Sequence, residues 1–140
     1  MLSNEQGALR RPFLFLVAIY FIATVAHFVH NAEFIAFYPN MPAWITRETV
    51  YFVWLAIASV GLAGLVAYRF GWRALGALLL GAYGALGLDG LQHYSLALCS
   101  EHTLAANVTI WFEAAAGIAL MAASALQMNI HLRTGRRDAG

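Results

Sequence analysis

Four long apolar stretches, separated by short polar segments, dominate the pattern of this chain. Each is about 20 residues or longer, and at about 1.5 Å per residue a helix of that length matches a hydrocarbon layer about 30 Å thick. The pattern predicts a single all-α domain over residues 1–140, an antiparallel bundle of four transmembrane helices. The predicted helices cover about residues 12–37, 50–70, 74–98 and 104–128.

Proline and polar residues mark where these helices begin and end. Pro12 is compatible with a first helical turn, and the segment Tyr38-Pro39-Asn40-Met41-Pro42 ends the first helix. The turn at residues 69–73 is too short for anything but two antiparallel neighbours. The polar segment 99–103 separates the third helix from the fourth.

Composition agrees with a membrane protein. The chain is 61% hydrophobic and 11% charged, with a mean hydropathy of +0.67. That charged fraction is about half of what soluble domains carry. A net charge of +1 without a basic run gives no reason to expect nucleic acid as a partner. The single cysteine, Cys99, excludes an intramolecular disulfide and a C-x-x-C metal site.

The arginines predict the orientation. Two precede the first helix, two flank the turn at residues 69–73 and three occupy the C-terminal tail, whereas the other two loops hold only Arg47. The positive-inside rule then places both termini in the cytoplasm. All eight basic residues are arginine, which is typical of a GC-rich bacterial genome. We therefore expect a multi-pass protein of the bacterial cytoplasmic (inner) membrane.

Small residues predict close packing of the last two helices. Gly81, Gly84, Gly87 and Gly90 recur every third residue, and the fourth helix is rich in alanine from residue 114 to 123. Small residues let the backbones of membrane helices approach each other closely.

Several polar side chains fall inside the apolar stretches, where an ionisable group costs about 2.5–3.5 kcal/mol on insertion scales. Such groups need a partner or a function. They are His27, His30, Asn31, Glu33, Asp89, Gln92, His93 and Glu113.

Counting residues from the cytoplasmic end of each helix places these groups at matching depths. His27, Asp89 and Glu113 fall at roughly 22–24 Å, and His30 and His93 at roughly 28–30 Å, on three different helices. His27 and His30 share a helix face, and Asp89 and His93 are one turn apart. The spacing predicts an inward-facing cluster in the outer half of the membrane.

Imidazole and carboxylate groups on facing helices are typical ligands of iron, zinc or copper. The same atoms suit proton transfer without a metal, with Glu113 and Asp89 as catalytic groups. Asn31 and Glu33 are candidates to orient the ligating side chains. The candidate metal ligands are His27, His30, His93, Asp89 and Glu113.

Each residue also has a purely structural interpretation. His27 and His30 are compatible with hydrogen bonding to each other near the outer interface. Asp89 and His93 are compatible with an intrahelical pair. For the segment 99–103, which contains a cysteine, an acid and a histidine, a solvated loop is the favoured interpretation.

Three functional classes follow. The leading hypothesis is a membrane-embedded metal-dependent or acid–base enzyme acting on a lipid-soluble substrate. Metal or proton translocation would need polar groups continuing toward the cytoplasm, where only Ser59, Tyr20, Tyr83 and Ser124 are candidates. A non-catalytic accessory subunit would have outward-facing glycines and dispersed histidines. Because four short helices enclose little volume, we expect self-association or a larger membrane partner.

The segment His30-Asn31-Ala32-Glu33-Phe34, followed by Tyr38-Pro39, resembles the HXXEE domain family of small bacterial multi-span membrane proteins. His30 and Glu33 match the first two positions of its His-x-x-Glu-Glu motif, and Phe34 replaces the second Glu. The resemblance implies that His30 and Glu33 belong to a site. It implies no activity, since none is assigned to the family.

Overall fold

The computed structural model describes the backbone of residues 2–137 and the side chains of residues 11–133. Four long helices form the described chain, and four shorter helical segments connect them. The long helices are α1 (Leu2–Glu33), α2 (Arg47–Arg69), α3 (Arg73–Leu86) and α5 (Leu104–Arg137). The short segments are the 3-10 helices η1 (Ile35–Phe37), η2 (Asp89–Gln92) and η3 (Cys99–Glu101) and the single-turn helix α4 (His93–Leu96).

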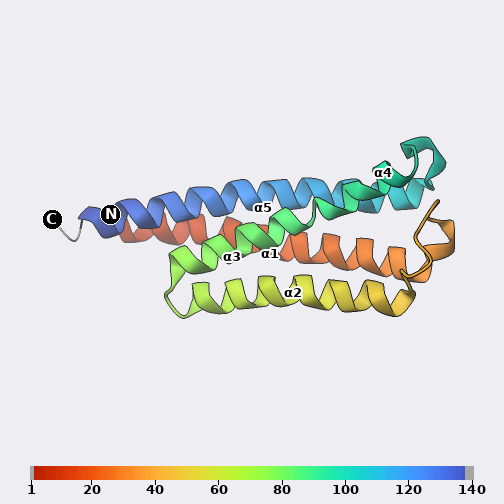
Figure 1. The fold of residues 1–140 in the computed structure, drawn as a ribbon. Coiled ribbons are helices and arrows are strands. Elements are labelled where there is room, and N and C mark those ends of the chain that lie inside the picture. Colours follow the sequence, from red (N-terminus) through yellow and green to blue (C-terminus); the bar gives the residue numbers. More distant parts are fainter. Residues whose placement is uncertain (1, 138–140) are drawn as a thin grey trace.

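The four long helices form an antiparallel bundle, which confirms the predicted fold class. α1 packs against α2 and α5, and α3 packs against the same two helices from the other side (Figure 1). We call the end at which α1 begins and α5 ends the terminal end, and the opposite end the distal end. The segments 34–46 and 97–103 lie at the distal end (Figure 1).

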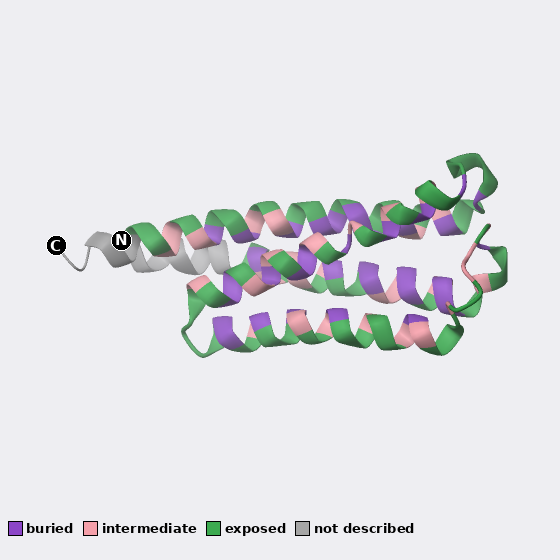
Figure 2. Cartoon of the chain, in the orientation of Figure 1, coloured by how far each residue is buried: buried purple, intermediate pink, exposed green. Residues whose placement is uncertain are grey.

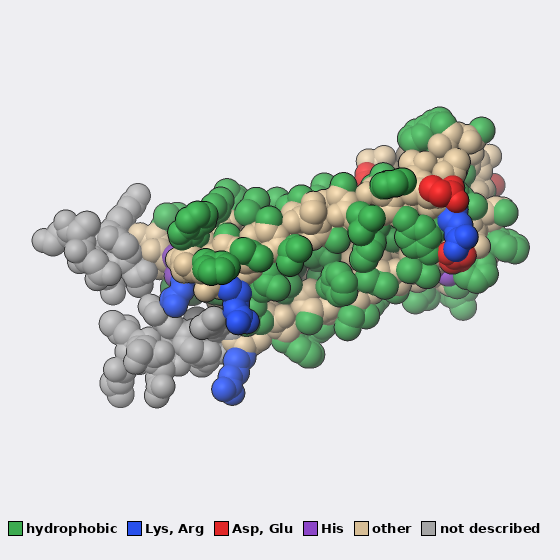
Figure 3. All heavy atoms as spheres, turned by 90° about the horizontal axis from the view of Figure 1, so that it is seen from below, with side chains coloured by type: hydrophobic (Ala, Val, Ile, Leu, Met, Phe, Trp, Pro, Cys, Tyr) green, Lys and Arg blue, Asp and Glu red, His purple; other side chains and the backbone are tan. Residues whose placement is uncertain are grey.

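Four helical spans are long and apolar enough to cross a membrane. They are Arg11–Glu33, Arg47–Arg69, Arg73–Leu96 and Leu104–Arg133. The outward faces of the helices are exposed along the bundle, although they carry large apolar side chains such as Phe15, Phe52 and Leu62 (Figure 2). Apolar side chains cover the length between the charged groups at the two ends (Figure 3). An apolar surface of this extent favours contact with lipid over contact with water.

Local sequence sets the bounds of α2. The Thr46 side chain accepts a hydrogen bond from the Thr49 amide at 3.3 Å, which caps the first turn of the helix. At the other end Gly71 has a φ of 95°, a conformation that other residues rarely adopt. This glycine lets the chain reverse between α2 and α3 within a few residues.

The third span differs from the continuous helix expected over residues 74–98. Its α-helix ends at Leu86, and the chain continues as η2 and α4 to Leu96. The Gly87 and Leu88 amides donate to the carbonyls three residues earlier, at 3.2 and 3.1 Å, which tightens the helix. A β-carbon at Gly87 would lie 2.5 Å from the Tyr20 hydroxyl of α1, so only glycine allows this approach. The interruption lies beside the buried polar groups.

The other spans agree with their expected positions more closely. α2 begins three residues before the expected residue 50, while α1 begins before residue 12 and α5 extends beyond residue 128. The first predicted helix ends at Glu33 rather than near residue 37, because η1 follows it as a separate turn.

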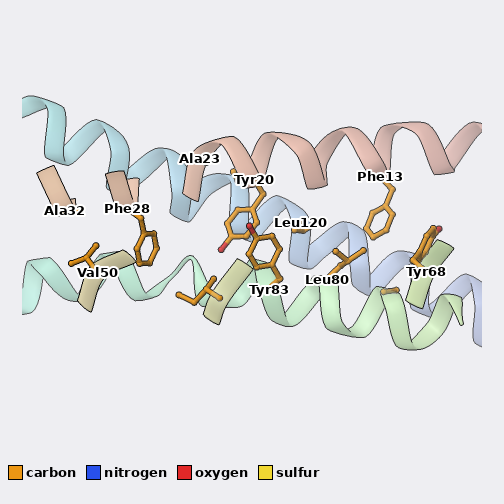
Figure 4. Close-up of a cluster of buried hydrophobic side chains, with 13 residues drawn as sticks. Phe13, Tyr20, Ala23, Phe28, Ala32, Val50, Tyr68, Leu80, Tyr83 and Leu120 are labelled. Carbon is orange, nitrogen blue, oxygen red and sulfur yellow. The ribbon is translucent and has the colours of Figure 1, made fainter. Parts of the chain in front are cut away.

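The terminal half of the bundle has an apolar and aromatic core. Leu80 and Leu120 are fully buried, and the Tyr20 and Tyr83 rings meet edge to face at 4.6 Å between centroids (Figure 4). The Tyr83 hydroxyl lies 3.3 Å from the Thr24 hydroxyl. This layer separates the distal polar groups from the terminal end.

Glycines bring α3 and α5 into backbone contact, as the sequence predicted. A β-carbon at Gly84 would lie 2.8 Å from the Gly117 carbonyl oxygen, and one at Gly117 would overlap the Gly84 carbonyl oxygen. A β-carbon at Gly81 would lie 3.1 Å from the β-carbon of Ser124. The glycine face is therefore turned toward α5.

We expect Gly84→Leu to destabilise the bundle, because its side chain would have to displace the α5 backbone. Overpacking of this kind costs about 1–3 kcal/mol. The measurement is unfolding of the purified protein in mixed detergent micelles. Ala63→Leu, on the exposed face of α2, is the control. Equal stability of the two variants would contradict the packing described above.

Candidate functional site

Glu113 and His27 form a shielded pair in the distal half of the bundle. Glu113, on α5, is 1% exposed, and His27, on α1, is 2% exposed. Nε2 of His27 lies 3.7 Å from Oε2 of Glu113. Because a hydrogen bond spans about 2.7–3.2 Å, a movement of about half an ångström would let a proton pass.

Helical periodicity places both side chains inside the bundle. On α5 the buried positions Ile110, Glu113, Gly117 and Leu120 recur at spacings of three and four residues. His27 follows Tyr20 and Thr24 on the buried face of α1 at the same spacing. A carboxyl and an imidazole thus occupy positions that apolar residues normally fill.

The interrupted third span completes the enclosure of this pair. A β-carbon at Gly90 would lie 3.3 Å from Oε2 of Glu113 and 3.5 Å from Nε2 of His27. A β-carbon there would touch both groups, so a side chain larger than that of alanine would press against them. The missing side chain at Gly90 therefore lets the backbone of η2 cover the pair closely.

His93 and Asn31 lie beside the pair. The Asn31 amide is 3.2 Å from Nε2 of His93, and the rings of His27 and His93 are 5.6 Å apart between centroids. Asn31 is 7% exposed and His93 is 9% exposed, so both are buried. Three elements, α1, α4 and α5, thus contribute to one polar cluster.

A cavity of about 170 Å³ borders this cluster. It lies where the chain from Asp89 to Leu96 leaves α2 and approaches α5 (Figure 1). Six polar residues contribute to its lining, namely His27, Asn31, Thr49, Asp89, Gln92 and His93. Glu113 is not among the lining residues and lies behind His27 and Gly90. The apolar lining includes Phe28, Met41, Trp44, Ile45, Val50, Val53 and Leu96.

Several polar atoms of the cluster have no hydrogen-bond partner among the described residues. They are Nδ1 of His27, Oδ1 of Asn31 and both carboxyl oxygens of Glu113. A buried polar atom without a hydrogen bond costs about 1–3 kcal/mol. Such a cost is more typical of a functional site than of a core built only for stability.

Tyr38 joins the distal loop to the cluster. Its hydroxyl lies 2.8 Å from Nδ1 of His30, and its ring is 4.7 Å from the His93 ring. The residue is 3% exposed, and this burial raises the pKa of Tyr38 to about 12. The phenol therefore stays protonated at neutral pH and can donate to His30. His30 is half-buried and reaches the cluster through Tyr38.

Two acids that the sequence singled out are exposed, unlike Glu113. Asp89 is exposed at the cavity rim, and among the described residues no hydrogen bond joins it to His93. Glu33 is also exposed, and it accepts hydrogen bonds from Arg47 at 2.9 Å and from Tyr51 at 2.6 Å. Glu33 therefore joins the end of α1 to the start of α2 and does not line the cavity.

Sequence reasoning overlooked the roles of Tyr38, Gly90 and His102. The solvated loop expected at residues 99–103 holds for Cys99 and Glu101, but it is wrong for His102, which is 7% exposed. Its ring lies 6.1 Å from the His93 ring, and its Nδ1 is 3.0 Å from a backbone carbonyl. The presence of a histidine in the short segment between two apolar stretches could have indicated a role for His102. Nothing in the sequence indicates that this loop folds over His93.

Between residues 11 and 133, no group of three or more His, Cys, Asp or Glu side chains is arranged to hold a metal ion. The predicted metal site stays a prediction.

Comparisons with protein-family models, curated proteins and solved structures found no match to this chain. The resemblance at residues 30–34 therefore also stays a prediction.

We expect Tyr38→Phe to lower the free energy of unfolding by about 1 kcal/mol, because it removes a partly buried hydrogen bond to His30. Tyr51→Phe, which removes an exposed hydrogen bond to Glu33, is the matched control and should cost less. Unfolding in mixed micelles gives both values. A Tyr38→Phe protein as stable as the Tyr51→Phe protein would argue against the bond.

Proposed function

We propose that this protein is a membrane-embedded acid–base enzyme that acts on a lipid-soluble substrate. One observation carries the proposal: His27 lines a cavity, and the carboxyl of Glu113 lies directly behind it at 3.7 Å, shielded from solvent and lipid. A carboxyl behind an imidazole is an arrangement that can move protons.

The cavity's surroundings support a substrate that enters from the bilayer. Its lining is mostly apolar, and it belongs to spans that are long and apolar enough to cross a membrane. The cavity is smaller than the roughly 300–1,000 Å³ of typical small-molecule pockets, so it would admit only part of a larger lipid. The rest of the substrate would remain among the acyl chains between α2 and α4.

The two nitrogens of His27 suggest the roles in proton transfer. Nε2 faces Glu113, and Nδ1 is the nitrogen left for the substrate. In the proposed step Nδ1 accepts a proton from a carbon atom of the substrate, and the Glu113 carboxylate stabilises the resulting imidazolium. Return of that proton to another atom of the same molecule completes an isomerisation. Asn31 and His93 would bind the polar group of the substrate.

We also propose where the protein and its cavity lie in the cell. The arginines near the terminal end favour a cytoplasmic position for both termini, in a bacterial inner membrane. The distal cavity then lies in the outer half of the bilayer.

Translocation of protons or a metal is the alternative class. Gln127 and Ser124 are buried toward the terminal end, and Tyr68 donates to Gln127 at 3.3 Å. The fully buried Leu80 and Leu120 lie between Tyr68 and the Tyr20–Tyr83 pair (Figure 4). This apolar layer favours an enzyme over a continuous path. The convergence of the histidines likewise favours an enzyme over an accessory subunit.

A deuterium-exchange experiment tests the proposal without a known substrate. Purified protein is incubated in D₂O with a total lipid extract of its host cells, and carbon-bound deuterium is measured by mass spectrometry. We expect one lipid-soluble component to gain deuterium. Glu113→Gln should slow this gain by at least about 100-fold, because the imidazolium that His27 forms loses the carboxylate that stabilises it.

Two further variants sharpen the result. Glu33→Gln makes the same change at an exposed acid and should leave the exchange rate unchanged. Gly90→Val should slow exchange, since its side chain would press against both His27 and Glu113 and displace them from their present positions. An extract in which no component gains more deuterium than the protein-free blank would refute the enzyme.

Metal analysis separates the acid–base form of the proposal from the metal-dependent form. For the acid–base form we expect no stoichiometric iron, zinc or copper in detergent-purified protein. A bound metal that is lost from the His27→Ala, Glu113→Gln double variant would instead support the metal-dependent form, with His27, His93 and Glu113 as ligands.

A further inference from the structure

A second and larger hollow lies on the lipid-facing side of α1 and α2, in the terminal half of the bundle. Its volume is about 390 Å³, within the range of about 300–1,000 Å³ that ligand pockets occupy. Leu14, Val17 and Phe21 of α1 form one wall, and Leu62 and Leu65 of α2 form the other. We call this hollow the α1–α2 groove.

Small residues explain why the groove is open. Ala18 and Ala58 face it from the two helices, so neither wall has a large side chain at these positions. At its floor the Tyr83 ring of α3 occupies the space beside Gly61, where a β-carbon would lie 2.7 Å from the ring. Tyr83 closes the groove toward the core but does not fill it.

The length of the groove matches one leaflet of a bilayer. Its lining on α2 extends from Ala58 to Arg69, which are eleven positions apart, or about 17 Å at 1.5 Å per residue. Half of a hydrocarbon core about 30 Å thick is about 15 Å. An apolar groove of this length, open to lipid, fits one extended acyl chain.

Charge at the mouth of the groove favours an anionic headgroup. Among the residues whose side chains the structure describes, Arg69 is the only charged one that lines it, and it lies at the terminal end, where α2 finishes. The described charged side chains near that end are all basic, whereas the acidic ones lie toward the distal end (Figure 3). An arginine can hold a phosphate by paired hydrogen bonds. The basic residues near this end are Arg11, Arg69, Arg73 and Arg133.

We propose that the α1–α2 groove is a binding site for one anionic phospholipid of the leaflet at the terminal end. One acyl chain lies along the groove against Tyr83, and Arg69 binds the headgroup phosphate. The site is separate from the distal cavity and does not depend on the enzymatic proposal.

Native mass spectrometry of the detergent-purified protein tests this site. The protein is titrated with phosphatidylglycerol and with phosphatidylcholine that carry the same acyl chains. We expect one phosphatidylglycerol to remain bound, with an affinity about fivefold above that for phosphatidylcholine. That ratio corresponds to about 1 kcal/mol for one basic residue near a membrane surface.

Four variants separate the effect of the charge from that of the groove. Arg69→Gln should remove the preference for phosphatidylglycerol, whereas Arg73→Gln makes the same change outside the groove and should keep it. Ala58→Phe should weaken binding of both lipids by filling the groove. Ala18→Leu is a milder filling variant for the case that Ala58→Phe does not fold, as judged by circular dichroism.

Two results would overturn the proposal. One is an equal loss of phosphatidylglycerol from the Arg69→Gln and Arg73→Gln proteins, which would show that only the general positive charge matters. The other is unchanged lipid retention in a folded groove-filling variant. Neither result bears on the deuterium exchange expected of the distal cavity.

Discussion

The structure depends on one costly constraint, the burial of the Glu113 carboxyl inside an apolar bundle. Charged groups at the centre of a membrane cost several kcal/mol, and Glu113 is 1% exposed. Its close ionisable partner is His27, and the backbone at Gly90 approaches the pair closely enough to exclude a larger side chain. The broken third span, the glycine at its break and the polar face of α1 all serve to enclose this pair.

The two halves of the bundle differ in how their helices pack. The terminal half is held together by apolar and aromatic packing around Leu80, Leu120 and the Tyr20–Tyr83 contact, and by glycines that bring α3 against α5. The distal half gives up regular helix packing, because α3 ends at Leu86 and the chain then leaves α2. The cavity lies at this departure. Rigid packing below a less regular, polar region is a common way to position a site.

Much of the candidate site followed from residue type and spacing. An ionisable residue in an apolar stretch indicates burial with a partner, and counting along helices placed His27 and Glu113 at one depth. The same reasoning could not tell that Glu113 is buried whereas Asp89 is exposed. Asp89 is exposed at the rim of the cavity, where the 3-10 helix η2 begins, whereas Glu113 is enclosed between the helices. Glu33 matched a motif, but the start of α2 brings Arg47 and Tyr51 to it instead.

The sequence alone determined four apolar helices, their antiparallel order and the presence of expensive buried polar groups, because these depend on local composition and on helix length. Only the tertiary structure decided which polar groups meet. The burial of Tyr38 and His102, the position of Glu113 behind His27 and the opening between α2 and α4 depend on contacts between segments far apart in the sequence or on how loops fold over helix ends. Periodicity within one helix carries no information about such contacts.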